Sequence, residues 1–150
     1  SFQLGISGFL QNFSDKNLWY GGSGFIKSRV MEKPRQTLDL RLDFGTRFSK
    51  NTDVPYYSPT QDRYINLASP FTQLLYQRYE HSLTHIITPD IGQYWQKGIG
   101  NRLVFGISYE QRWKYENWYE IGYGISRRRS FYDGEKQYAT TFLLKINFKF

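Results

Sequence analysis

The feature that most constrains this chain is an alternation of apolar and polar residues with a period of two, sustained over long runs. From Tyr138 onward, even positions read Tyr, Thr, Phe, Leu, Ile, Phe and Phe, whereas odd positions are mostly small or polar. Alternation at 180° per residue is typical of a β-strand whose two faces meet different environments. The same alternation recurs in 37–48, 102–113 and 118–125. The sequence therefore predicts an all-β fold.

Segments with Gly, Asn, Asp and Pro, the residues of turns, separate most of the alternating runs. Their positions predict eight antiparallel strands in hairpin succession, at 1–13, 18–31, 36–48, 63–77, 82–96, 102–114, 118–131 and 136–150. Pro70 interrupts the fourth run, and Pro89 demands a bulge or a local break in the fifth, because proline cannot donate to a strand ladder. The period is blurred in the first, second and fourth runs.

These strands are long for a soluble protein, whose strands average about 5–6 residues. About 13 residues at roughly 3.3 Å each, tilted by about 40–45°, cover the ~30 Å hydrocarbon layer of a membrane. Aromatic residues, among them Trp19, Trp95 and Trp113, gather near strand ends, where membrane interfaces lie. Residues 1–150 are therefore predicted to form an antiparallel transmembrane β-barrel of the outer-membrane type. The alternative is a soluble barrel whose apolar side chains face inward.

Composition and motifs argue against catalysis. The chain has no cysteine, which excludes disulfides, thiol chemistry and cysteine-ligated zinc. His81 and His85 lie about 13 Å apart on an extended strand, too far to share a metal ion. We find no nucleophile elbow, phosphate-binding loop or dinucleotide fingerprint. We therefore expect no catalytic residue, no metal and no cofactor.

The net charge of +7 permits a polyanionic partner, but the predicted exposed face is an apolar band rather than a basic groove. No nucleic-acid partner is therefore expected. No apolar run is long enough for a transmembrane helix. The chain begins at Ser1 without methionine or a leader, so either a signal was removed or the chain is the C-terminal piece of a longer protein. The family resemblance described below favours the second.

Five short motifs follow one another in the second and third parts of the chain. They are PYYSP at 55–59, YQRYE at 76–80, GQYWQ at 92–96, YEQRW at 109–113 and RSFYDG at 129–134. In this order they resemble the C-terminal region of the poly-β-1,6-N-acetyl-D-glucosamine export porins, the PgaA or HmsH family. The N-terminal third of the chain matches that family only in its barrel pattern.

The resemblance implies a sixteen-stranded outer-membrane barrel behind a periplasmic tetratricopeptide superhelix. Such a barrel passes partially deacetylated poly-N-acetylglucosamine out of the cell for biofilm matrix, and this chain would be its C-terminal half. One alternative is another barrel that follows a periplasmic helical repeat, as in cellulose export or surface-lipoprotein assembly. A second is a small eight-stranded structural or adhesion barrel, whose closed interior would be filled by side chains.

Alternation assigns a set of charged residues to the barrel lumen. The predicted polysaccharide path consists of Asp39, Asp43, Asp90, Tyr94, Glu110 and Glu120. Arg41, Arg112, Lys145 and Arg128 share this face, so the lumen is mixed, whereas the resemblance implies an electronegative one. The acids either make transient contacts with ammonium and hydroxyl groups of a moving polymer or pair with Arg41 and Arg112. Tyr94 either stacks on sugar rings or packs against neighbours.

Arg127 and Arg129 belong to a run of three arginines near the end of a predicted strand. Since adjacent strand residues alternate faces, these two can point toward lipid headgroups and bind lipopolysaccharide phosphates. The alternative is that they are basic residues at the base of a loop, exposed to water. We expect the C-terminus to lie in the periplasm, where the barrel assembly machinery would read Phe150. The connections at 14–17, 49–63, 97–101 and 133–134 would then face outward.

Overall fold

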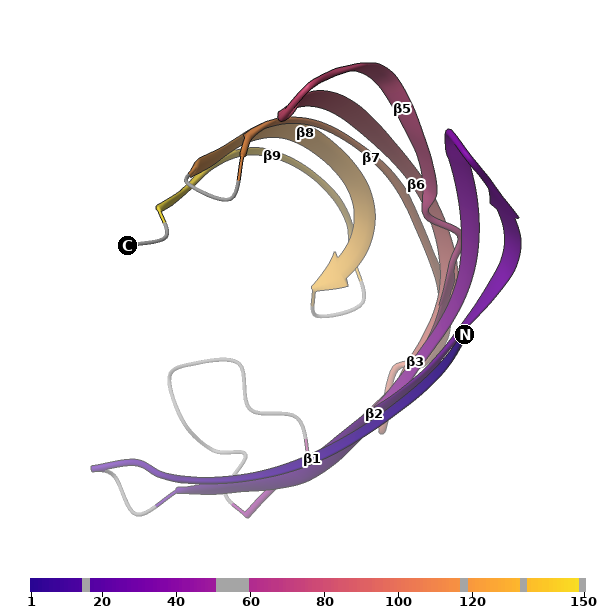
Figure 1. Cartoon of the computed structure of the whole chain (residues 1–150). Helices are drawn as coiled ribbons and strands as arrows, with labels where there is room; N and C mark the ends of the chain where they lie inside the picture. The colour runs from indigo at the N-terminus through magenta and orange to yellow at the C-terminus, as the bar shows by residue number, and fades with distance from the viewer. Residues whose placement is uncertain (15–16, 51–59, 117–118, 133–134, 149–150) are drawn as a thin grey trace.

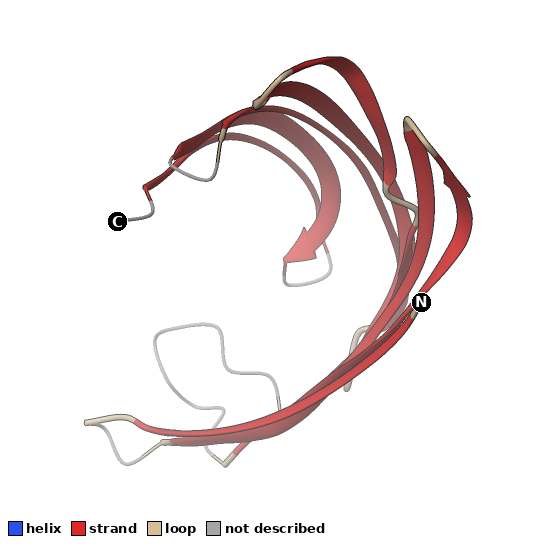
Figure 2. Ribbon diagram, viewed as in Figure 1, coloured by secondary structure: helices blue, strands red, loops and turns tan. Residues whose placement is uncertain are grey.

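The structure is a computed structural model, and it describes residues 1–14, 17–50, 60–116, 119–132 and 135–148. Within this part the regular elements are all strands (Figure 2). They are β1 (Phe2–Asn12), β2 (Leu18–Lys33), β3 (Gln36–Ser49), β4 (Gln61–Ala68), β5 (Phe71–Arg78), β6 (His81–Gln96), β7 (Gly100–Tyr115), β8 (Tyr119–Tyr132) and β9 (Glu135–Phe148). The described residues contain no helix long and apolar enough to cross a membrane.

All nine strands belong to one antiparallel sheet, in which neighbours in sequence are neighbours in space. The order is β1-β2-β3-β4-β6-β7-β8-β9, and β5 continues the line of β4 between β3 and β6. The sheet bends into an open trough with β1 and β9 at its two free edges (Figure 1). The predicted all-β meander is therefore confirmed, with one strand position divided in two.

The division falls at Ser69 and Pro70, inside the predicted strand 63–77. β4 begins at Gln61, earlier than predicted, and ends before this dipeptide. Pro70 has no N–H to contribute to a ladder, yet the break stays bonded to both neighbours. The N–H of Ser69 donates to the carbonyl of Pro89 over 3.0 Å, and the N–H of Asp39 donates to the carbonyl of Pro70 over 3.0 Å.

The predicted bulge or break at Pro89 is wrong. β6 runs without interruption from His81 to Gln96, and Pro89 lies opposite Ile107 of β7 in an unbroken register. On its other side, Pro89 faces the gap between β4 and β5. Its missing donor therefore falls where the neighbouring strand is itself interrupted. The register shifts lie elsewhere, between Arg29 and Met31 and between Leu74 and Tyr76.

A side-chain contact identifies the concave face of the sheet. Nη2 of Arg128 on β8 donates to Oδ1 of Asn66 on β4 over 3.1 Å, although β6 and β7 lie between these strands. Strands in a sheet are about 4.8 Å apart, so this contact spans roughly 14 Å of sheet. Side chains approach one another in this way only on the concave face, because they diverge on the convex one. The charged residues in register with Arg128 and Asn66 therefore line the inside of the trough.

The two faces reverse the usual order of burial. Asp39 and Asp62 are only 6% and 4% exposed, whereas Leu144 on the convex face is 69% exposed. Among the described residues, Ala68 and Val104 are the only buried hydrophobic side chains. Such a sheet has no apolar core to hold it in water. It fits a bilayer, where lipid covers the apolar face and the hydrogen-bonded backbone satisfies itself.

Candidate functional site: the concave face of the sheet

The structure places all of the predicted path residues on the concave face. Asp39 and Asp43 lie on β3, Asp90 and Tyr94 on β6, Glu110 on β7 and Glu120 on β8. The register between neighbouring strands shows this, because residues that are partners in a ladder point to the same side of the sheet. Arg41, Arg112, Lys145 and Arg128 share this face, as alternation predicted. Their position does not test their role in transport, which stays a prediction.

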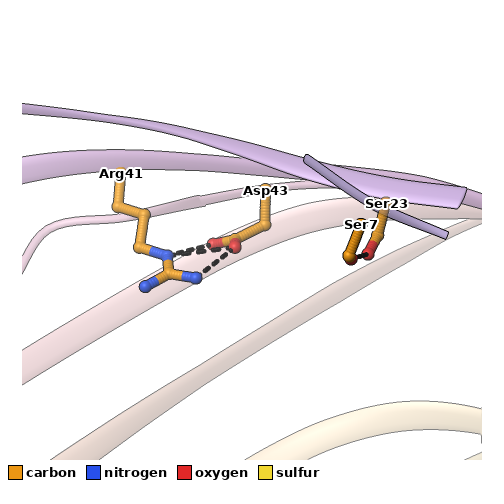
Figure 3. Close-up of polar contacts among 4 residues, drawn as sticks. All are labelled: Ser7, Ser23, Arg41 and Asp43. Atoms are coloured by element: carbon orange, nitrogen blue, oxygen red, sulfur yellow. Dashed lines mark hydrogen bonds and ion pairs between the residues drawn. The ribbon is translucent and has the colours of Figure 1, made fainter. Parts of the chain in front are cut away.

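Arg41 and Asp43 form a two-point ion pair along β3 rather than across strands (Figure 3). Nε and Nη2 of Arg41 both donate to Oδ1 of Asp43, over 3.0 and 2.8 Å. The guanidinium of Arg41 also lies 4.3 Å from the ring centroid of Phe25. Such a geometry orders the arginine and leaves the carboxylate of Asp43 largely neutralised.

Asp39 is held by two bases of β2. Lys27 Nζ lies 3.0 Å from Oδ2, and Arg29 Nε donates to Oδ1 over 2.9 Å. Pairing with Arg41, the alternative considered for the lumen acids, does not occur here. Since Asp39 is buried and fully paired, its carboxylate is poorly placed to receive a passing cation.

The acids of β6, β7 and β8 differ in how closely they pair with arginines. Nη2 of Arg112 lies 2.7 Å from Oε1 of Glu110, whereas Nε of Arg112 lies 3.6 Å from Oε1 of Glu120. Asp90 Oδ2 lies 3.3 Å from Arg128 Nη2, is buried and has no hydrogen-bond partner. Glu120, the most exposed of these acids, therefore keeps the most capacity for a further contact, whereas Oδ2 of Asp90 is buried and unsatisfied.

Several of these groups surround a hollow on the concave face toward the β2–β3 turn. Its volume is about 450 Å³, and its walls come from six strands, β2, β3, β5, β6, β7 and β8. The charged residues around it are Lys27, Arg29, Asp39, Arg112, Lys114 and Glu120. Bases outnumber acids there, so this part of the lumen has mixed charge rather than the electronegative character that the resemblance implies.

Sequence reasoning missed Asp62, which it assigned to the connection 49–63. In the structure Asp62 lies on β4, where Nε of Arg47 donates to its Oδ2 over 3.0 Å. The hydroxyl of Tyr94 donates to the same oxygen over 3.0 Å. Tyr94, predicted for the sugar path, is therefore tied to an acid of the neighbouring strand. The alternation of Asp62, Tyr64 and Asn66 with Arg63, Ile65 and Leu67 was the available signal.

Sequence reasoning also missed a group of aromatic side chains inside the trough. Phe9, Trp19, Phe25 and Tyr64 occupy concave positions, in register with Arg47, Asp43 and other lumen residues. Trp19 had been predicted for the membrane interface, and instead Arg47 lies over its ring at 4.7 Å from the centroid. These residues are the physical reason for the blurred period of β1 and β2, because apolar side chains face both sides there.

On the convex face, Arg127 and Arg129 both point outward, with Arg128 between them pointing in. The guanidinium of Arg127 lies 5.8 Å from the ring centroid of Tyr138. That of Arg129 lies 5.4 and 5.2 Å from the centroids of Phe105 and Phe131, and its Nε is buried without a hydrogen-bond partner. In the described strands no carboxylate takes a convex position.

Within the described residues, no three His, Cys, Asp or Glu side chains gather in a possible metal site. Nε2 of His85 lies 3.1 Å from Oε1 of Gln73 on the convex face, and the His81 ring packs against Tyr115 at the end of the strand, with centroids 4.3 Å apart and planes tilted by 59°.

A curved antiparallel sheet with a charged concave face and an apolar convex face defines a wall of a transmembrane β-barrel. Over residues 2–150 the chain belongs to the family described as the PgaA membrane beta barrel domain. The expected family and the outer-membrane barrel fold are therefore confirmed.

Three relatives bear on this assignment. The chain is 26% identical to the poly-beta-1,6-N-acetyl-D-glucosamine export proteins of Escherichia coli K12 and O157:H7, covering 99% of this chain but 18% of each relative. A solved structure, described as a bacterial polysaccharide outer membrane secretin, superposes with a TM-score of 0.95 at 26% identity. That match covers 99% of this chain and 51% of the other. This chain therefore spans about half of the solved structure and about a fifth of the curated relatives.

Proposed function

We propose that this chain forms half of an outer-membrane pore that translocates partially deacetylated poly-β-1,6-N-acetyl-D-glucosamine for biofilm matrix. The observation that carries the proposal is the concave face, on which polar and charged side chains from β2 to β9 line one continuous surface. The family match and the relatives' names, which specify export of this polymer, support the choice of substrate. The other export and assembly barrels considered have no such support.

The remaining half of the barrel would come from strands outside this chain. The match to 51% of the solved structure supports this division, and it agrees with a barrel of about sixteen strands. We place the C-terminus in the periplasm, with Phe150, which lies outside the described residues, available to the assembly machinery. Such a pore acts by guiding a polymer, and the proposal requires no catalytic step.

Within the pore, the acids would lower the cost of passing ammonium groups through a narrow, poorly hydrated passage. Glu120 is the leading position, because its ion pair at 3.6 Å is the loosest of the set and its side chain is the most exposed of the five acids. Asp39, Asp43 and Glu110 are more tightly paired. Weak contacts suit transport, since a polymer held tightly at one site would not move on.

The test replaces all five acids in the full-length protein, as D39N/D43N/D90N/E110Q/E120Q. Extracellular polymer, measured against the amount of heat-modifiable barrel, should fall well below wild type, whereas each single replacement should do little. The control E80Q/E116Q removes two carboxylates from the β5–β6 and β7–β8 connections and should leave export unchanged. Full export by the fivefold variant would assign these acids to barrel structure alone.

We also propose that Arg127 and Arg129 bind lipopolysaccharide phosphates from the convex face. Arginine suits phosphate because its planar guanidinium donates two parallel hydrogen bonds. The support is the outward direction of both side chains and the absence of carboxylates among the described convex positions of the strands. R127Q/R129Q should copurify with less lipopolysaccharide than wild type does, while R128Q, on the concave face, should match wild type. Equal copurification would refute the contact.

A further inference from the structure

Two aromatic rings on the concave face lie across glycines of the neighbouring strand. Phe9 of β1 is the register partner of Gly21 on β2, and Tyr64 of β4 is the partner of Gly45 on β3. A methyl group added to Gly21 would lie 3.0 Å from Cε1 of Phe9 and closer still to the backbone carbonyl oxygen of Thr46 on β3. One added to Gly45 would lie 2.6 Å from Cε1 of Tyr64, closer than real side-chain atoms approach. The glycines therefore allow both rings to lean along the wall instead of projecting into the lumen.

These two rings differ from the concave rings of Phe25 and Trp19 in what covers them. Phe25 and Trp19 each carry a guanidinium, from Arg41 at 4.3 Å and from Arg47 at 4.7 Å from the ring centroid. The structure records no cation over Phe9 or Tyr64, among the residues it describes. Their exposed fractions are 44% and 40%. Both rings are therefore open to whatever occupies the lumen.

Polar groups lie near the two rings, at the same height along the strands. Register places Phe9 two residues further along the sheet than Tyr64, about 7 Å on the strand repeat. The hydroxyls of Ser7 and Ser23, 2.8 Å apart, lie on the same wall between β1 and β2, in the row of Tyr64 (Figure 3). A surface of open rings beside hydroxyls matches a hexose, which has apolar C–H faces and polar edges.

We propose that Phe9 and Tyr64 form a stacking platform for successive sugar rings of the exported polymer. The inference rests on the proposed function, and it adds an uncharged binding surface to the ionic one. Each ring excludes water from one sugar face without a fixed hydrogen bond, so the polymer gains a contact at this level and loses little on sliding past. The platform lies toward the β1–β2 and β3–β4 turns, away from the charged hollow.

The experiment uses the full-length protein in planar bilayers and a partly N-acetylated β-1,6-glucosamine oligosaccharide as the probe. Blockade of the ion current as a function of oligosaccharide concentration gives a dissociation constant. F9L/Y64L keeps apolar side chains over both glycines but removes the aromatic faces, and it should bind about tenfold more weakly, the loss expected for two stacking contacts. Y64F keeps the ring and should bind as wild type does.

The matched control is F44L. Phe44 of β3 covers Gly24 of β2 in the same manner but on the convex face, so its replacement tests aromatic packing without touching the lumen. It should leave the blockade unchanged. A wild-type pore that the oligosaccharide does not block would overturn the proposed function itself. A wild-type blockade that F9L/Y64L retains at full strength, or an F9L/Y64L chain that does not assemble, would overturn the platform alone.

Discussion

At the scale of single residues, the side chain's face decides what a substitution does. Leu144 and Lys145 are adjacent on β9, yet Leu144 points to the convex face and Lys145 to the concave one, with Tyr123 and Gly122 of β8 as register partners. The same charge is therefore costly at one position and harmless at the next. This difference gives a direct test of the face assignment.

Replacing Leu144 with arginine should destabilise the folded barrel by about 2–4 kcal/mol if the residue lies near the bilayer midplane, because a guanidinium must enter hydrocarbon. K145Q should change stability little, since its side chain faces the lumen. Urea unfolding of full-length protein in lipid vesicles measures both. A Leu144→Arg barrel as stable as its parent would contradict the convex assignment of β9.

Two carboxylates at one end of the trough repel each other. Glu80 lies in the β5–β6 turn, and the neighbouring Glu116 carboxylate raises the pKa of Glu80 through a shared hydrogen bond and charge repulsion. A raised pKa means that the folded state holds the proton more tightly than the unfolded state does. The stability that this proton contributes is present at low pH and lost as pH rises through the folded pKa.

E116Q should therefore gain stability relative to wild type as the pH rises from acidic to neutral. The effect should be small, because both groups are exposed to solvent. Urea midpoints of the two proteins at several pH values measure it. Q77E, which adds a carboxylate nearby, should shift the relative midpoint in the opposite direction. Parallel midpoints of wild type and E116Q at all pH values would refute the coupling.

At the scale of elements, the alternation of connections between the two ends of the sheet fixes the topology. Thr60 precedes β4, at one end, and its carbonyl accepts a hydrogen bond from the N–H of Ser49 over 3.2 Å. Tyr79 follows β5, which continues the line of β4, and is 86% exposed at the opposite end. One of these residues must face the cell exterior if the sheet spans the membrane.

A cysteine at Thr60 should react with an impermeant maleimide in intact cells, and one at Tyr79 only after the outer membrane is opened. The chain has no native cysteine, so each variant reports a single site. Mass shift of the protein measures the labelling. Labelling at Tyr79 but not at Thr60 in intact cells would invert the proposed orientation.

At the scale of the whole molecule, the two free edges of the sheet determine whether it can exist in a membrane by itself. The backbone N–H and C=O groups on the outer sides of β1 and β9 have no strand partner among the described residues. In hydrocarbon each unsatisfied group costs several kcal/mol, so an open sheet edge does not persist there. The trough therefore requires further strands to complete a barrel.

Residues 1–150 refolded alone in detergent should not give a heat-modifiable, ion-conducting species, whereas the full-length protein should give both. Gel mobility before and after boiling, together with bilayer conductance, makes the comparison. A closed eight-stranded species from this chain would contradict the half-barrel and support the small-barrel alternative. A conducting species of twice the mass would show that two copies supply each other's missing edge.

The sequence by itself determined which face each regular strand residue takes. Asp39, Glu110, Leu144 and Lys145 all lie where alternation put them, because side-chain direction in a strand follows from covalent geometry alone. Turn residues likewise located most strand boundaries. Pro70 divided its strand for a reason that is local to the residue, the absence of a backbone donor.

Only the tertiary structure decided which residues meet. Asp39 pairs with Lys27 and Arg29 of the adjacent strand, because register, which alternation does not specify, brings them together. Register also places Pro89 opposite the gap between β4 and β5, and β6 therefore continues without a break. The sequence analysis assigned no face to the aromatic residues Phe9 and Tyr64, because the period is blurred in the runs that hold them. The way both rings lean along the wall depends on glycines one strand away, and no pattern within a single strand contains that information.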